Sequence, residues 1–120
     1  AVTALTSLDR GDLDDLGFEC NVKDLVISRA KRAFEAGCDG IVSSGLEVPF
    51  IREYVDNKLI CVTPGIRPVA NDDDQKRVVD VATAFKSGSD YIVVGRPIKN
   101  SKNRYEAASN IQNIIKKTFD

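Results

Sequence analysis

Four short runs of apolar residues, rich in valine, isoleucine and leucine, stand out at residues 2–6, 40–43, 59–63 and 91–94. The last three runs are nearly continuous rather than alternating with polar residues. Continuous runs of this length are typical of strands buried on both faces, as in a parallel sheet that helices cover. We therefore expect four parallel strands.

The segments between and after these runs have helical spacing. Apolar residues recur there at steps of three and four, which predicts helices at residues 22–36, 46–55, 75–86 and 101–119. Gly37 and Gly88 follow the first and third of these segments, where a glycine commonly ends a helix. We expect Asn100 or Ser101 to cap the last helix.

The order of elements predicts the fold class. Strands that alternate with helices form a parallel sheet. Four βα units in 120 residues make 30 residues each, so eight units would need 240, close to the roughly 250 of a TIM (β/α)8 barrel. We expect one α/β domain over residues 1–120, a (β/α)4 half of such a barrel with parallel strands and outer helices. A four-stranded doubly wound sheet is the alternative.

Composition and charge exclude several classes of function. The net charge of −1 leaves no basic excess for nucleic acid, and no apolar run approaches the ~20 residues of a membrane span. The absence of histidine removes Ser-His and Cys-His pairs and most transition-metal sites. Three widely spaced cysteines form no zinc or redox motif and predict reduced thiols and a cytoplasmic location. We expect no metal.

Candidate chemistry lies where the predicted strands end, which is where α/β barrels carry their functional residues. Gly65 and Gly95 follow the third and fourth strands and would let the backbone approach a ligand closely. Arg67 and Arg96 follow them with planar donors that suit a phosphate. Loops after the last two strands of a barrel often form a phosphate site. The alternative is that these are turn glycines and solvated arginines.

Several motifs give this pattern a family. TPGIRP at residues 63–68 is followed by Asp74-Gln75 and then by SDYIVVGRPI at residues 89–98. VTALTS at residues 2–7 and CDGIVSS at residues 38–44 precede them. In this order and spacing, the chain resembles orotidine 5′-phosphate decarboxylases over essentially its whole length. The resemblance implies a homodimeric (β/α)8 barrel without cofactor or metal, which converts orotidine 5′-monophosphate to UMP and CO2 in de novo pyrimidine biosynthesis.

The resemblance also implies residues on the base side of a nucleotide site. Thr6 would contact the nucleotide from the end of its strand, and Ser7 would lie beside it near the pyrimidine. Pro64 would help to wall the base pocket. Ser7 and Pro64 equally suit a strand end or a turn, so a purely structural role stays open for both.

The phosphate side is implied in the same way. Arg67 and Gln75 would belong to a loop that closes over the phosphate, with Gln75 reaching between phosphate and base. Gly95 would give a backbone N–H to the phosphate, and Arg96 its guanidinium. Residues 68–74, with proline, alanine, asparagine and three aspartates, have the polar, turn-prone composition of a mobile loop.

The chain departs from the family at the reaction centre. The resemblance implies a catalytic lysine within a D-x-K-x-x-D motif, and neither candidate completes it: Cys61 stands three residues after Lys58, and Val79 three residues after Lys76. We assign no catalytic residue and expect no decarboxylation by the chain alone. Its open sheet edges predict a partner, either an N-terminal half-barrel chain or a second copy.

Two other functions stay open. The chain could be a catalytically inactive half-barrel that binds a nucleotide or phosphate and associates with itself. It could also belong to a different phosphosugar barrel enzyme, although Asp74-Gln75 after TPGIRP argues against that.

Overall fold

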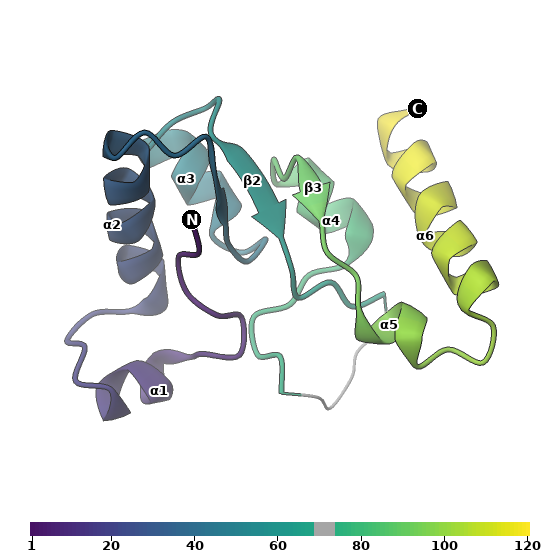
Figure 1. Cartoon of the computed structure of the whole chain (residues 1–120), viewed down its shortest axis with the longest axis horizontal. Helices are drawn as coiled ribbons and strands as arrows, with labels where there is room; N and C mark the ends of the chain where they lie inside the picture. Colours follow the sequence, from purple (N-terminus) through teal and green to yellow (C-terminus); the bar gives the residue numbers. More distant parts are fainter. Residues whose placement is uncertain (69–73) are drawn as a thin grey trace.

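Three short parallel strands form the sheet of the computed structural model, which describes residues 1–68 and 74–120. The strands β1 (Gly40–Val42), β2 (Ile60–Thr63) and β3 (Tyr91–Ile92) are neighbours in chain order (Figure 1). Parallel pairing of strands that helices connect confirms the predicted α/β class.

The predicted first strand is reduced to one point of pairing. Val2 forms an isolated parallel bridge with Val42, and the Thr3 N–H donates to the Val42 carbonyl at 3.1 Å. Beyond Thr3 the segment leaves the sheet, because the carbonyls of Ala4 and Leu5 accept hydrogen bonds from a side chain instead of a strand. The predicted strand at residues 2–6 is therefore wrong as a strand, but the segment does lie beside β1.

Within the described residues, six helices accompany the sheet: α1 (Arg10–Asp15), α2 (Val22–Glu35), α3 (Val48–Tyr54), α4 (Val81–Lys86), α5 (Arg96–Lys99) and α6 (Arg104–Phe119). The N-cap Asn21 accepts from the Asp24 N–H and begins α2 at the predicted residue. Asn103, not the predicted Asn100 or Ser101, caps α6. No helix in the described ranges has the length and apolar character that a bilayer span requires.

The helix predicted at residues 75–86 begins six residues later than expected. Val79 forms a parallel bridge with Ile66 instead, and Arg67 N donates to Val79 O at 3.0 Å. Asp80 then caps α4 by accepting from the Thr83 N–H. Tertiary hydrogen bonds thus override a local apolar periodicity that also suited a helix.

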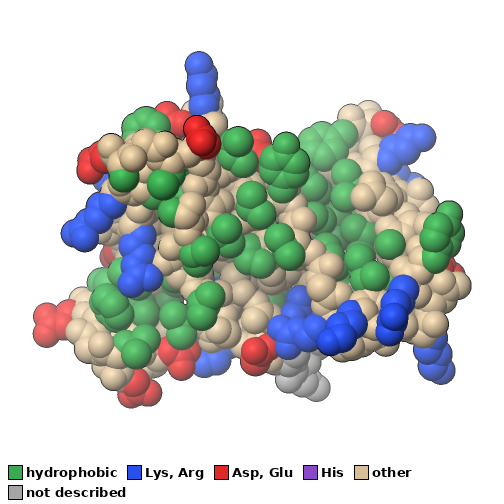
Figure 2. All heavy atoms as spheres, in the orientation of Figure 1, with side chains coloured by type: hydrophobic (Ala, Val, Ile, Leu, Met, Phe, Trp, Pro, Cys, Tyr) green, Lys and Arg blue, Asp and Glu red, His purple; other side chains and the backbone are tan. Residues whose placement is uncertain are grey.

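One face of the sheet is covered and the other is open. In Figure 1 α3 and α4 lie behind the sheet, and in Figure 2 apolar side chains are exposed across the middle of the front face. Tyr91 is 62% exposed and Val93 50%, whereas Ile41 and Cys61 are buried on the covered side. The predicted burial of both faces is not met, because nothing in the described residues packs on the front.

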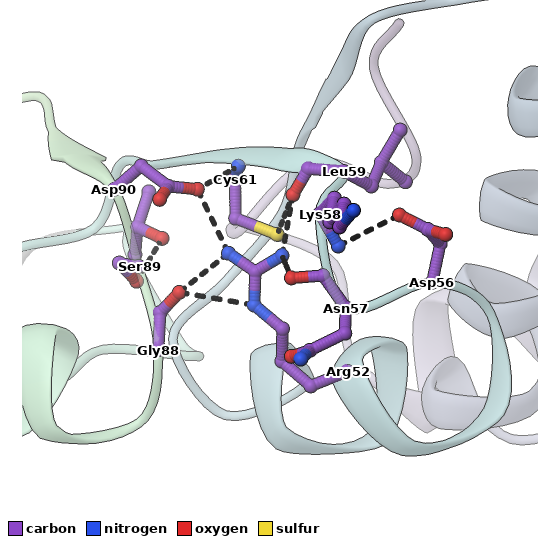
Figure 3. A network of polar contacts seen from close by, with 10 residues as sticks. Arg52, Asp56, Asn57, Lys58, Leu59, Cys61, Gly88, Ser89 and Asp90 are labelled. Atoms are coloured by element: carbon purple, nitrogen blue, oxygen red, sulfur yellow. Dashed lines mark hydrogen bonds and ion pairs between the residues drawn. The ribbon is translucent and has the colours of Figure 1, made fainter.

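The side chain of Arg52 fastens the amino ends of the strands (Figure 3). Its guanidinium donates to the Leu59 carbonyl before β2 and to the Gly88 carbonyl before β3. It also lies 2.8 Å from the Asp90 carboxylate, which accepts from the Cys61 N–H. The Arg52 side chain is only 17% exposed, so these charge-assisted bonds form largely out of water.

We predict that Arg52→Met lowers the free energy of unfolding by about 2–3 kcal/mol, because it leaves several carbonyls and a carboxylate without their donor. Denaturant unfolding followed by circular dichroism measures the change. Arg10→Met is the matched control, since Arg10 forms an exposed pair with Asp14 four residues on and its loss should cost at most about 0.5 kcal/mol. Equal losses in the two variants would contradict the prediction.

Candidate functional site

A cavity of about 280 Å³ lies where the strands end and combines six of the seven residues predicted for the site. Those six are Thr6, Pro64, Arg67, Gln75, Gly95 and Arg96. Their convergence follows from parallel pairing, which brings the carboxyl ends of all strands to one edge. Ser7 is half-buried and is not among the residues that line the cavity. Its contact with a ligand stays a prediction.

A backbone turn that requires glycine shapes one wall. Gly65 has a φ of +74°, a conformation that side-chain-bearing residues rarely adopt. A Cβ at this position would also lie 3.0 Å from the Arg77 carbonyl oxygen. The turn after β2 is therefore built on Gly65, and it directs Pro64 and Arg67 to the same cavity.

Two guanidinium groups, those of Arg67 and Arg96, line the cavity. In Figure 2 Lys and Arg side chains gather along the lower edge of the front face, around the position of α5. Arg96 Nη1 lies 2.6 Å from Asp74 Oδ1, and this hydrogen bond holds the pKa of Asp74 below its ordinary value. Arg67 Nη1 donates to the Ile66 carbonyl at 2.8 Å. The two guanidinium groups suit an anion with several acceptor oxygens.

The cavity also has apolar side chains and a polar pair in its lining. Leu5 and Val93 line it and are 61% and 50% exposed. The Thr6 hydroxyl contacts the Gln75 side-chain oxygen, and both residues face the cavity. An apolar surface with a few placed polar groups is the usual construction of a small-molecule site. The cavity thus suits a ligand with an anionic group and a weakly polar one.

The described residues that line this cavity include no lysine, aspartate, glutamate or cysteine. They therefore offer no side chain that commonly transfers a proton near neutral pH. Nor do the described residues contain a cluster of three acidic or cysteine side chains placed to hold a metal ion. The cavity can bind and orient a ligand, but its own side chains give no acid or base for a reaction.

Lys58 and Lys76, which the sequence analysis rejected as catalytic, both lie away from the cavity lining. Lys58 precedes β2, at the opposite end of the sheet. The Lys76 ammonium lies 2.8 Å from Asp12 Oδ2 and 3.1 Å from Asp9 Oδ2, which ties the segment after Gln75 to the start of α1. These two carboxylates raise the pKa of Lys76.

Sequence reasoning missed this attachment of α1. Asp9 and Asp12 form a capping box, in which each side chain accepts from the backbone N–H of the other residue. The Asp-x-x-Asp spacing is a detectable signal of a helix start. The pairing with Lys76, 64 residues later, leaves no such local signal.

Comparison with protein families identifies relatives over nearly the whole chain. Residues 1–111 match the family model described as "Orotidine 5'-phosphate decarboxylase / HUMPS family". A protein of Methylococcus capsulatus named orotidine 5′-phosphate decarboxylase is 60% identical over 99% of this chain and 50% of its own length. A namesake from Nitrobacter winogradskyi is 48% identical over 99% of this chain and 49% of its own length. The chain spans about half the length of these relatives.

Solved structures agree with the sequence matches. The crystal structure of orotidine 5′-phosphate decarboxylase from Lactobacillus acidophilus matches 95% of this chain and 47% of its own, with a TM-score of 0.75 and 34% identity. The enzyme from Pyrococcus horikoshii matches 96% of this chain and 49% of its own, with a TM-score of 0.68 and 26% identity. This chain is similar to about half of those barrels, as a half-barrel should be.

We predict that Lys76→Met raises the pKa of the Asp9 carboxyl but leaves it below the ordinary value of 3.8, because the stronger influence, the Asp12 N–H, remains. Carboxyl-detected NMR titration measures this. A lowered pKa favours the folded state above pH 3.8, and this contribution disappears as the pH falls through the folded-state pKa. Lys58→Met is the control and should leave Asp9 unchanged, since Lys58 lies at the other end of the sheet.

We also predict that Asp74→Asn raises the affinity for inorganic phosphate by about two- to fivefold, because it removes the carboxylate that pairs with Arg96. NMR titration of the chain with phosphate measures the dissociation constant. Asp14→Asn changes the net charge equally, lies on α1 outside the cavity lining and should leave the affinity unchanged. A phosphate affinity that is equal in all three proteins would contradict a role of Asp74 at the anion site.

Proposed function

This chain belongs to the orotidine 5′-phosphate decarboxylase / HUMPS family, and we propose that it supplies βα units five to eight of a decarboxylase (β/α)8 barrel. In this proposal it carries the phosphate site and part of the pyrimidine site for orotidine 5′-monophosphate and UMP. The whole barrel would convert the first nucleotide to the second with release of CO2, a step of de novo pyrimidine biosynthesis. A cytoplasmic location remains a prediction.

The observation that carries the proposal is the shared cavity at the carboxyl ends of the strands. Arg67 and Arg96 can donate planar, charge-assisted hydrogen bonds to a phosphate dianion, and Gly95 can add a backbone N–H. Pro64 and Thr6 line the same cavity, and the resemblance places the pyrimidine beside them. A nucleoside monophosphate combines a phosphate dianion with a pyrimidine ring and fits this set of residues.

Such a ligand explains how remote binding can assist the reaction. The pyrimidine ring offers few charges to hold, whereas the phosphate offers two, so most of the binding energy comes from the end that does not react. A loop that closes over the phosphate also excludes water from the pyrimidine ring. Residues 69–73, within the loop expected to close at residues 68–74, lie outside the described residues.

The proton donor must come from outside these four units. In the reaction the bond between the ring carbon and the carboxylate breaks, CO2 leaves, and its electron pair stays on the carbon, which then takes up a proton. The resemblance assigns that proton to a lysine flanked by aspartates. The cavity lining described here contains neither, so we propose that the other half of the barrel supplies both.

The exposed apolar residues support a partner half. Leu5 is 61% exposed, Tyr91 62% and Val93 50%, and Val93 lines the same cavity as Leu5. We propose that four further βα units cover this surface, on the same polypeptide or on another chain. Burial of such side chains contributes about 25 cal/mol per Å² and would favour association.

A second candidate function is nucleotide or phosphate binding without turnover, by a half-barrel that pairs with its own copy. The specific observation in its favour is that this one chain provides both the arginines and the apolar residues that line the cavity. In that case the isolated chain binds UMP and sediments as a dimer. A decarboxylase half instead gains turnover only when it is completed.

The test joins this chain to the half of the Methylococcus capsulatus relative that it does not match. We predict that the joined protein forms UMP and CO2 from orotidine 5′-monophosphate, while the 120-residue chain alone forms neither. Absorbance of the pyrimidine ring follows the conversion. A joined protein that unfolds cooperatively but forms no UMP would contradict the proposal.

Arg96→Ala in the joined protein should lower kcat/KM about 100-fold, because it removes charge-assisted bonds to the phosphate. Arg10→Ala is the control, since Arg10 pairs only with Asp14 on the exposed face of α1 among the described contacts. An unchanged kcat/KM for Arg96→Ala would place the phosphate elsewhere.

A further inference from the structure

A buried arginine outside the cavity lining joins two of the segments that carry polar residues of the cavity, those of Thr6 and Gln75. The Arg77 side chain is 8% exposed and its ion-pair partner Glu47 is 6% exposed. Arg77 Nε donates to the Leu8 carbonyl at 3.0 Å, and Nη2 donates to the carbonyls of Leu5 at 2.7 Å and Ala4 at 3.3 Å. One guanidinium thus binds three carbonyls within residues 4–8.

The same residue is fastened through its backbone. The N–H groups of Lys76 and Arg77 both donate to the Thr6 carbonyl, at 3.2 and 3.1 Å. Residues 4–8 therefore wrap around Arg77, with Thr6 held at the centre. Two residues before Arg77 stands Gln75, whose side chain contacts the Thr6 hydroxyl. The position of Thr6 relative to Gln75 depends on this set of bonds.

The charge of Arg77 is balanced by one buried carboxylate. Arg77 Nη1 lies 2.7 Å from Glu47 Oε1, while Glu47 Oε2 has no hydrogen-bond partner among the described residues. A buried ion pair of this kind is not by itself an efficient source of stability, because both charges lose their hydration. A planar fork of five donors, however, can fix several carbonyls in one geometry, which a lysine ammonium cannot do.

We propose that Arg77 is a positioning residue that fixes the base-side residue Thr6 against the phosphate-side segment containing Gln75. Its side chain does not line the cavity, so it acts through these residues rather than on the ligand. The inference rests on the proposed function for the identity of the ligand. The position of Thr6 relative to Gln75, however, can be measured on the chain without a ligand. A ligand that contacts both Thr6 and the Gln75 segment needs Arg77 to hold these residues in place. Inorganic phosphate, which would bind Arg67 and Arg96, does not.

The test compares Arg77→Lys with the unchanged chain by NMR. UMP affinity should fall about 10-fold, and the affinity for inorganic phosphate should stay within about twofold. The nuclear Overhauser contact between the Thr6 methyl and Gln75 side-chain protons should disappear, while contacts among the core residues Val48 and Ile51 persist. A merely structural role would lower the melting temperature but leave both affinities unchanged well below it.

Two further variants keep the test independent of folding. Glu47→Gln combined with Arg77→Met removes both buried charges, so it should melt above Arg77→Met alone and still bind UMP about 10-fold more weakly than the unchanged chain. Arg29→Lys is the matched control, because Arg29 Nη1 donates to the Thr3 carbonyl of the same segment from α2 and does not reach Gln75. Its UMP affinity should stay within about twofold.

The outcomes separate the two proposals. A joined protein that folds but forms no UMP from orotidine 5′-monophosphate contradicts the proposed function. Persistence of the Thr6–Gln75 contact in Arg77→Lys overturns the positioning role, whether or not UMP binds. Parallel weakening of UMP and phosphate overturns it too, since Arg77 would then support the whole site rather than the relation between its two ends.

Discussion

Parallel pairing of three short strands is the constraint on which the rest of this molecule depends. Because β1, β2 and β3 run in one direction, residues as distant in sequence as Thr6 and Arg96 reach the same edge. The amino ends of the strands, on the opposite side, meet the chain segments that lead into the strands. This common direction places the cavity at the carboxyl ends of the strands and the contacts of Arg52 at their amino ends.

Two arginines serve those two ends in related ways. Arg52 binds the carbonyls that precede β2 and β3, and Arg77 binds the carbonyls of the segment that leaves the edge of the sheet. Each guanidinium donates several hydrogen bonds to backbone carbonyls that lie outside the strand pairs. In a sheet this short, backbone hydrogen bonds between strands are few, so side chains supply much of the connection between segments.

The sequence predicted well what depends on local pattern. The apolar periodicity at residues 22–36 predicted α2 to within one residue, and six of the seven residues expected at the site line one cavity, although their contact with a ligand stays a prediction. The start of the helix expected at residues 75–86 was wrong, because the segment before Asp80 pairs with Ile66 and Thr6 instead. Arg77 and Glu47 could not be found in this way, since a buried ion pair between distant residues has the same local sequence as two surface charges.

The pairing of Asp74 with Arg96 has a consequence for selectivity. A guanidinium that already holds a carboxylate gains little by exchanging it for another singly charged acceptor such as chloride or acetate. A dianion gains more, because it brings a second charge and further oxygens to the same donors. The Asp74 carboxylate should therefore weaken the binding of monovalent anions at Arg96 more than the binding of a dianion.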